Sequence, residues 1–278
     1  MAPRVKLAQG ELQGTQHHHH QAYLGIPFAN PPVGELRFRP PQAAESWSGV
    51  RDATVFGASC PQGHHPIPGM AASGSRDEDC LYLNVFTPAA DARARAVLFW
   101  IHGGGFQLGS GSELLYNGGP LAERGDLVVV TIHYRLGALG YAYFGPAGDS
   151  WGATPNNGQL DQIEALKWVR ENITSFGGDP DNITIFGESA GASAIATLLA
   201  MPAGRGLFSK AILQSGCGAR TRSADSCIAL TERLLHELSL DSGDLAAISK
   251  LPVDQIVQAQ QAVSSGENGM GGFGPVQD

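Results

Sequence analysis

Two short stretches with glycines, each directly after an apolar run, contain groups that could take part in catalysis: a serine hydroxyl in one and backbone N–H groups in the other. The first is "GESAG" at residues 187–191, which follows "NITIF" and precedes "ASAIATLLAM". In a G-x-S-x-G turn between a strand and a helix, the two glycines leave room for a sharp bend that exposes the serine hydroxyl. The amide groups that begin the following helix point toward the same hydroxyl. We therefore expect Ser189 to be a nucleophile in acyl transfer.

The second stretch is "HGGGF" at residues 102–106, which follows the apolar run "AVLFWI". A run of glycines lets the backbone approach a substrate closely. We expect the N–H groups of Gly104 and Gly105, together with that of Ala190, to converge on the oxyanion of a tetrahedral adduct. A plain glycine-rich turn would explain one of these stretches, but not both at the ends of two strands.

The elements that must position these residues follow from the periodicity of the apolar residues. The runs at 96–101 and 127–134 are typical of buried strands, and "LDQIEALKWVRENI" has apolar residues at spacings of three and four, as in a helix packed on a sheet. Strand and helix patterns then alternate through "ITIFG", "ASAIATLLAM", "KAILQSG" and "ALTERLLHELSL". This order predicts an α/β fold with a mostly parallel central sheet and helices on both faces.

The first 90 residues have a different pattern, with short strand-like segments broken by turns. We expect an antiparallel edge and a long loop in residues 1–90, and the two glycine-rich motifs with the following helices in residues 91–278. No linker divides the chain. The glycine-rich stretch "SSGENGMGGFGPVQD" at its end closes no predicted element, so it is either a flexible tail or a chain cut within a fold.

Charge and hydropathy exclude two classes of partner. The formal net charge is −8, and Lys and Arg form no cluster, which argues against a nucleic-acid partner. No segment approaches the ~20 consecutive apolar residues of a membrane span, and the N-terminus lacks the apolar core of a signal peptide. We expect a soluble protein, either cytoplasmic or, if numbered after processing, secreted.

Cysteines and histidines raise the question of disulfides and metals. Cys60, Cys80, Cys217 and Cys227 form two pairs that are local in sequence, without metal-binding spacing. They are compatible with two disulfides or with four free thiols in a reducing compartment. The four histidines at 17–20 precede "QAYLGIPFA" and are interpreted as a solvated hairpin turn rather than a metal tract. No metal or cofactor is expected.

Longer stretches are more specific than either glycine motif: "GIPFANPPVGELRFRPP", "EDCLYLNVFTP", "WIHGGGFQLGS", "NNGQLDQIEALKWVRENITSFGGDP", "ITIFGESAGA" and "AILQSG". In these stretches the chain resembles the type-B carboxylesterases, the cholinesterase-like branch of the α/β-hydrolases. The resemblance implies an α/β-hydrolase fold and hydrolysis of carboxylic esters, with short-to-medium acyl esters as the expected substrates. Amidase, lipase and polyester hydrolase activities remain open.

The resemblance also assigns roles to individual residues. Ser189 matches the nucleophile, and the three N–H groups named above match the oxyanion-hole donors. Cys60 and Cys80 match the family's first disulfide, while Cys217 and Cys227 are a possible second one. Glu188 and Ser215 resemble supporting positions, although a packed polar role explains each of them equally well.

Other positions depart from the family pattern. His133 stands where the family usually has Asn, so we expect a packed variant rather than a catalytic base. The loop between Cys60 and Cys80 has no Trp, which argues against a cholinesterase proper. After Ser189 the only histidine is His236, in a predicted helix at a half-exposed position, and no acid motif of the family precedes it.

The family order of serine, acid and histidine is therefore incomplete here. We expect these 278 residues to be the N-terminal half of the enzyme, with the general base and its acid supplied by a C-terminal half. Such a half would expose strand edges, so the isolated chain should fold poorly or associate. The alternative is a non-catalytic interaction module of the same fold. It is disfavoured because such modules typically lose the serine or the oxyanion glycines.

Overall fold

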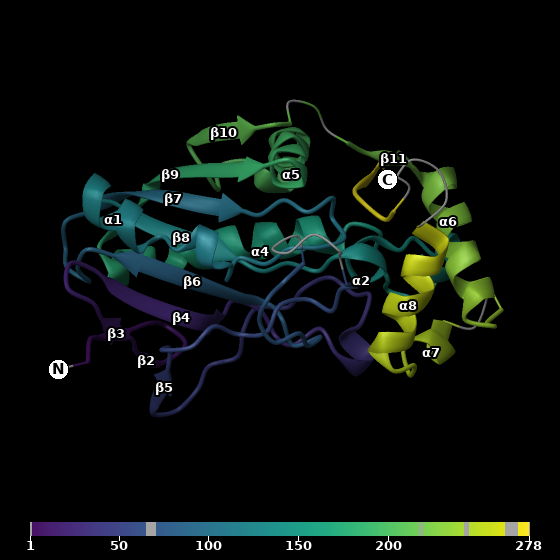
Figure 1. Ribbon diagram of the computed structural model, residues 1–278, viewed down its shortest axis with the longest axis horizontal. Helices are drawn as coiled ribbons and strands as arrows, with labels where there is room; N and C mark the ends of the chain where they lie inside the picture. Colours follow the sequence, from purple (N-terminus) through teal and green to yellow (C-terminus); the bar gives the residue numbers. More distant parts are fainter. Residues whose placement is uncertain are drawn as a thin grey trace.

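A seven-stranded sheet forms the centre of the computed structural model, which describes residues 2–64, 71–216, 218, 220–241, 245–264 and 272–277 (Figure 1). The strand order in this described part is β10-β9-β7-β8-β6-β4-β3. The strands are β3 (Thr15–Gln16), β4 (Gln21–Pro27), β6 (Tyr82–Thr87), β7 (Arg95–Ile101), β8 (Val128–Ile132), β9 (Gly178–Glu188) and β10 (Lys210–Gln214).

Strand directions divide this sheet into two parts. Strands β8, β7, β9 and β10 are parallel to one another, whereas β6, β4 and β3 are joined to the sheet by antiparallel pairings. The parallel strands are the apolar runs of the sequence, and every residue of β8 is buried, as is typical of strands covered on both faces. The expected N-terminal antiparallel edge is confirmed.

The helices are α1 (Gly119–Gly125), α2 (Gly137–Tyr141), α3 (Gly145–Trp151), α4 (Asn157–Asn172), α5 (Ala190–Ala200), α6 (Ala224–Glu237), α7 (Leu245–Ile248) and α8 (Val253–Ser264). Short 3-10 turns are η1 (Gly34–Leu36), η2 (Leu114–Tyr116), η3 (Ile173–Phe176) and η4 (Pro202–Gly204). Two small sheets contain β1 (Arg4–Lys6), β2 (Glu11–Gln13) and β5 (Val50–Asp52), and β11 (Arg222–Ser223) with β12 (Val276–Gln277).

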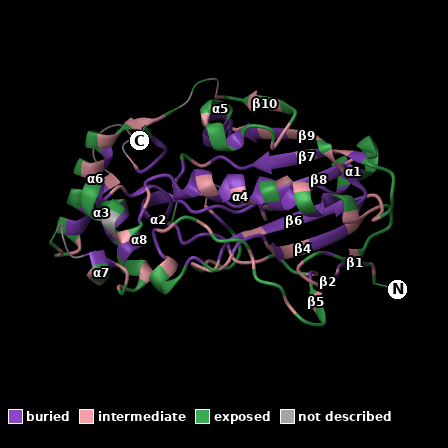
Figure 2. Ribbon diagram, turned by 180° about the vertical axis from the view of Figure 1, so that it is seen from behind, coloured by how far each residue is buried: buried purple, intermediate pink, exposed green. Residues whose placement is uncertain are grey.

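The alternation of side chains along β8 builds a core on each face of the sheet. Val128, Val130 and Ile132 join the main core, which also holds the apolar residues of α4 and α5. Val129 points the other way, into a small cluster with Ala122 of α1. Helices therefore cover both faces, and Figure 2 shows buried strands beneath partly exposed helices.

The histidines at 17–20 form the expected hairpin turn between β3 and β4. Gln16 pairs with Gln21, and the His17 N–H donates to the His20 carbonyl at 2.8 Å. Three of the four side chains are exposed, and the rings of His17 and His20 stack at 4.5 Å. Within the described residues, no group of three or more His, Cys, Asp or Glu side chains is arranged to hold a metal ion.

The structure corrects the prediction of a Cys60–Cys80 disulfide and leaves the second predicted pair, Cys217 with Cys227, untested. Cys60, Cys80 and Cys227 are free and buried, whereas Cys217 lies outside the described residues. Cys60 and Cys80 are adjacent thiols, and their hydrogen bond, together with burial, raises the pKa of Cys80. Burial likewise raises the pKa of Cys227 to about 11, and its S–H donates to the Tyr141 carbonyl at 3.2 Å.

The last described segment, residues 272–277, is docked rather than loose. Its strand β12 pairs in parallel with β11, and the side chain of Asn156 both donates to and accepts from the backbone of Val276, at 3.0 and 2.9 Å. Phe273 is fully buried in the main core. The interpretation as a flexible tail is therefore wrong for these six residues, while residues 265–271 lie outside the described part.

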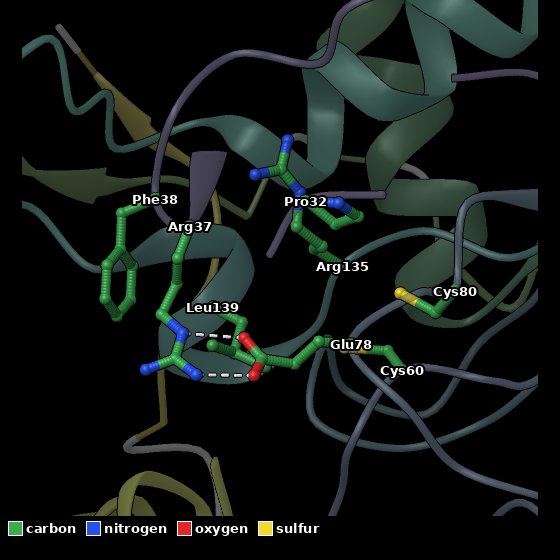
Figure 3. Close-up of a pocket in the computed structure, with 8 residues that line it drawn as sticks. All are labelled: Pro32, Arg37, Phe38, Cys60, Glu78, Cys80, Arg135 and Leu139. Atoms are coloured by element: carbon green, nitrogen blue, oxygen red, sulfur yellow. Dashed lines mark hydrogen bonds and ion pairs between the residues drawn. The ribbon is translucent and has the colours of Figure 1, made fainter. Parts of the chain in front are cut away.

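Two buried arginines, Arg37 and Arg135, connect the N-terminal loops to helices through hydrogen bonds. Arg37 donates to both carboxylate oxygens of Glu78, at 2.7 and 2.5 Å, as Figure 3 shows, and to the carbonyls of Ile248, Ser249 and Leu251 at the end of α7. Arg135 forms a similar bidentate pair with Asp161 of α4.

No helix in the described part of the chain has the length and apolar character needed to span a membrane.

Replacing Arg37 with Met should lower the free energy of unfolding by about 3–5 kcal/mol, because it leaves the Glu78 carboxylate and three carbonyls without their donor in a buried site. Urea unfolding measures this loss. Arg93→Met is the control, since the Arg93 ion pair with Asp126 is exposed and should contribute less than about 1 kcal/mol. Equal losses in the two variants would contradict the role given to Arg37.

Candidate active site

The backbone of Ser189 is bent into a conformation that L-residues rarely adopt. Strand β9 ends at Glu188 and helix α5 begins at Ala190, so the whole change of direction falls on Ser189, which has φ 54° and ψ −117°. Hydrogen bonds hold it there: its N–H donates to the Gln214 carbonyl of β10 at 2.9 Å, and its carbonyl accepts from the Ser193 N–H at 3.0 Å.

The glycines on either side of Ser189 are required by space. A Cβ on Gly187 would lie 2.7 Å from the Ile101 carbonyl oxygen, and a Cβ on Gly191 would overlap that oxygen and lie 2.9 Å from the His102 carbonyl. Neither glycine has a positive φ, so glycine is required at both positions by the close packing between the turn and the end of β7 and not by the backbone conformation. The motif glycines therefore bring α5 directly against β7.

The glycine loop, residues 102–109, leaves β7 at the point where this strand meets the GESAG turn. Ile101 pairs with Gly187 in the sheet, so both segments leave it at the same edge. A Cβ on Gly103 would lie 3.3 Å from the Ser189 Cβ and 2.7 Å from the Glu188 carbonyl oxygen. The glycine loop is thus packed directly on the candidate nucleophile.

Three backbone N–H groups at this junction remain open. Gly104 and Gly105 have positive φ values of 108° and 64°, and no acceptor among the described residues takes the N–H of Gly104, Gly105 or Ala190. Ala190 is the first residue of α5, where a helix leaves its N–H groups unpaired. Nothing lies within 4 Å of a Cβ built on Gly105, which is exposed. These donors can take an anionic oxygen beside Ser189.

The two predicted supporting residues also lie at this junction. Glu188 immediately precedes Ser189, and its carboxylate Oε2 lies 3.1 Å from the Cβ position of Gly103. Ser215 follows β10, is exposed and has φ 54°. The next residue, Gly216, approaches the nucleophile closely, since its Cβ would lie 2.8 Å from the Ser189 carbonyl oxygen.

The nearby histidines are packed into the core. Burial lowers the pKa of His102 to about 3; its Nδ1 contacts the Gly103 carbonyl at 2.8 Å and its ring stacks on Tyr134. Burial lowers the pKa of His133 to about 4, and its ring nitrogens contact Ser110 and the Ala58 carbonyl. His133 is therefore the packed variant that we expected.

A general base for Ser189 is not found in the described part of the chain, where no histidine hydrogen-bonds to the Ser189 side chain. The late histidine of the sequence, His236, is exposed in the last turn of α6. In Figure 1, α6 lies well away from the junction of β9 and α5.

Sequence reasoning did not single out Gly103, which has no space for a side chain between itself and the Ser189 turn. Its signal was present in the "HGGGF" run, because a third glycine beyond the two expected donors indicates a close approach. It also did not predict the strained backbone of Phe106, a non-glycine residue with φ 63°. No pattern in one sequence marks a strained phenylalanine.

Comparison with known proteins identifies the fold and the family. The model of the carboxylesterase family matches residues 1–278. The chain is 43% identical over 270 residues to the para-nitrobenzyl esterase of Bacillus subtilis, covering 95% of this chain and 54% of that protein. It is 41% identical over 261 residues to the phenmedipham hydrolase of Pseudarthrobacter oxydans, covering 92% and 51%.

A solved structure gives the same result for the fold. The crystal structure of a Geobacillus stearothermophilus carboxylesterase superposes with a TM-score of 0.90 at 44% identity, over 98% of this chain and 55% of that one. The protein is thus an α/β-hydrolase in fold. The chain belongs to the carboxylesterase family, and it spans about half the length of the relatives it matches.

Substituting Gly191 with Ala should lower the free energy of unfolding by about 3 kcal/mol or more, because the new methyl group would meet the carbonyls of Ile101 and His102, which cannot move away. Gly152→Ala is the control: nothing lies within 4 Å of its Cβ, so its positive φ alone should cost about 1 kcal/mol. Urea unfolding compares the two variants. A loss at Gly191 no larger than that at Gly152 would contradict the packing described.

The two buried histidines predict how stability changes with pH. The folded pKa values of His102 and His133, about 3 and about 4, lie below the value of about 6.5 for an unfolded histidine. At a pH between the folded and the unfolded value, the unfolded chain therefore binds more protons than the folded chain. The free energy of unfolding should therefore fall as the pH decreases from about 6.5 to about 4, by up to ~1.4 kcal/mol per pH unit for each histidine.

His133→Asn should remove one of these two contributions. Urea unfolding at pH 5 to 6 should give a smaller slope of free energy against pH than the unsubstituted chain, while measurements above pH 7.5 give the packing cost separately. An unchanged slope would show that His133 is not held neutral by burial.

Proposed function

We propose that this chain is the nucleophile-bearing part of a serine carboxylic-ester hydrolase. The observation that carries the proposal is the contact of the glycine loop with Ser189, which puts open backbone N–H groups beside a hydroxyl on a strained turn. The relatives support it, since one is named an esterase and another a hydrolase.

The reaction proceeds through an acyl-enzyme. Ser189 Oγ attacks the ester carbonyl carbon and loses its proton to a general base, while the carbonyl π electrons move onto the oxygen. The N–H groups of Gly104, Gly105 and Ala190 stabilise that oxyanion. Collapse of the adduct breaks the bond to the alcohol, which leaves with the proton. Water then cleaves the acyl-enzyme, releasing the carboxylic acid and restoring Ser189.

The general base and its orienting acid come from a region beyond this chain, a C-terminal half that completes a single α/β-hydrolase domain. The buried, neutral state of His102 and His133 supports this, because His102 Nδ1 and both ring nitrogens of His133 contact atoms of the core rather than Ser189. The share of each relative that the chain covers, 54% and 51%, is consistent with a missing half. Glu188 and Ser215 have supporting roles beside Ser189.

The C-terminal half covers the sheet next to β10. In the described part of the chain β10 is an edge strand that pairs only with β9. Ile212, Phe186 and Trp100 are in register across β10, β9 and β7, and Ile212 is 47% exposed. An unpaired edge that carries an exposed apolar side chain is a surface that natural proteins cover.

The substrates expected from the family resemblance are esters with short-to-medium acyl chains. The open space at Gly105, beside the Ser189 turn, is compatible with such substrates. The relatives act on different compounds by name, para-nitrobenzyl esters and phenmedipham, so the site is assigned to the class of carboxylic esters rather than to one of them.

Ser189→Ala in the complete protein, meaning this chain joined to its C-terminal half, should abolish turnover of a p-nitrophenyl ester, lowering kcat by ~10⁴-fold or more because no other group can form the acyl-enzyme. An organophosphonate should label the peptide that carries Ser189. Residues 1–278 alone should give no steady turnover.

The control is Ser48→Ala, an exposed serine far along the chain from the GESAG turn, which should leave kcat unchanged. Unreduced turnover by the Ser189→Ala variant, or a phosphonate adduct on another peptide, would contradict the assignment of Ser189 as the nucleophile. A complete protein with no turnover at all would favour an interaction module.

A further inference from the structure

Gly104, Gly105, Phe106 and Gln107 form a tight turn that carries two of the three open donors. The Gln107 N–H donates to the Gly104 carbonyl at 3.1 Å, and both central residues have positive φ, 64° at Gly105 and 63° at Phe106. Positive φ at both central positions is the pattern of a type I′ turn, which favours Gly, Asn or Asp. Phe106 is none of these, so the turn is strained and must be held by its surroundings.

The backbone of Phe106 is held from one side by α2. The Gly137 N–H donates to the Phe106 carbonyl at 2.7 Å, and the Phe106 ring is buried edge-on against Tyr141 at 5.5 Å. Gly274 of the last described segment approaches the same ring, since its Cβ would lie 3.4 Å away. The ring is therefore fixed in the core.

The turn is also held by a chain of side-chain hydrogen bonds from α8. Gln260, which is 6% exposed, accepts from the Ala138 N–H at 2.7 Å and donates to Gln107 Oε1 at 2.9 Å. The Gln107 amide in turn donates to the Phe273 carbonyl. Both oxygens thus accept and both amides donate, so the chain fixes the orientation of each side chain.

These contacts close into a loop. The Gln260 amide lies directly on Gly137, where any Cβ would overlap it, and Gly137 is the residue that holds the Phe106 carbonyl. Gln260 therefore contacts Gly137, which holds the Phe106 carbonyl, and also Gln107, the last residue of the turn. Phe273, at the far end, belongs to the docked segment that Asn156 and β11 secure.

We propose that Gln107 and Gln260 are positioning residues that hold the strained turn so that the Gly104 and Gly105 N–H groups face the oxyanion. Neither side chain touches the substrate, and both act through the turn. The proposal rests on the proposed function in one respect: the donors matter for catalysis only if Ser189 forms an acyl adduct. That the glutamine chain rigidifies the turn does not depend on it.

The experiment compares Gln107→Met, Gln260→Met and the double variant in the complete protein, because Met preserves length while removing every hydrogen bond of the chain. Turnover of a p-nitrophenyl ester gives kcat and KM, and urea unfolding gives stability. Hydrogen exchange of the peptide spanning 103–109 reports the turn without reference to activity. Gln255→Met is the matched control, since Gln255 is exposed on the same helix.

Each single variant should lower kcat about tenfold with little change in KM, a part of the ~10²–10³ lost when an oxyanion donor is removed outright. Hydrogen exchange at 103–109 should accelerate in both variants. The double variant should be no worse than either single one, because both changes break the same chain.

Two results would overturn the proposal. One is a kcat equal to that of Gln255→Met with only stability lost, which would make the glutamines structural. The other is exchange at 103–109 that stays unchanged in Gln260→Met. If the unsubstituted protein shows no Ser189-dependent turnover, the proposed function fails, and the exchange measurement alone decides whether the glutamine chain holds the turn.

Discussion

The structure of the site depends on one contact, in which the end of β7 packs against the turn that carries Ser189. Ile101 and Gly187 are paired in the sheet, and the carbonyls of Ile101 and His102 fill the space where Gly191 would have a side chain. This contact forces α5 to begin directly beneath the glycine loop. It therefore sets the position of the Ser189 hydroxyl and of the Gly104 and Gly105 donors together, although they come from segments about 85 residues apart.

Strain at this contact is offset by the surrounding sheet and helices. Ser189 and Phe106 both have φ values that L-residues avoid, each of which costs of order 1–3 kcal/mol. Ser189 is held by hydrogen bonds to β10 and within α5, and Phe106 by α2, by Tyr141 and by the segment that ends in β12. Helices, strands and the last described segment thus fix the backbone at this junction. The last described residues are part of that support rather than a tail.

Much of this site could be predicted from the sequence, because the reasons are local. A G-x-S-x-G sequence between a strand and a helix indicates a sharp turn at the serine. The run of glycines after "AVLFWI" indicates a backbone that closely approaches a neighbouring segment or a ligand. Apolar spacing within residues 160–173 predicted the helix that the structure places at Asn157–Asn172, and the alternation of strand and helix patterns predicted the parallel strands. The packed state of His133 was predicted from the family resemblance, because His133 stands where the family usually has Asn.

What the sequence did not predict depends on contacts between distant residues. Gln107 and Gln260 are 153 residues apart, and nothing in either local pattern indicates that their amides meet. The docking of residues 272–277 likewise depends on Asn156, 120 positions earlier. For Cys60 and Cys80 the resemblance gave the correct neighbours but not the bond, because proximity in the fold does not decide the oxidation state of two buried thiols.

The most direct test of the central claim is a crystal structure of the complete protein after reaction with an organophosphonate. Phosphorus should be bonded to Ser189 Oγ, and one phosphonyl oxygen should lie about 2.7–3.1 Å from the backbone nitrogens of Gly104, Gly105 and Ala190. Ser189 should keep its positive φ. A phosphonyl oxygen directed away from the glycine loop, or those nitrogens bonded to other protein atoms, would contradict the proposed oxyanion hole.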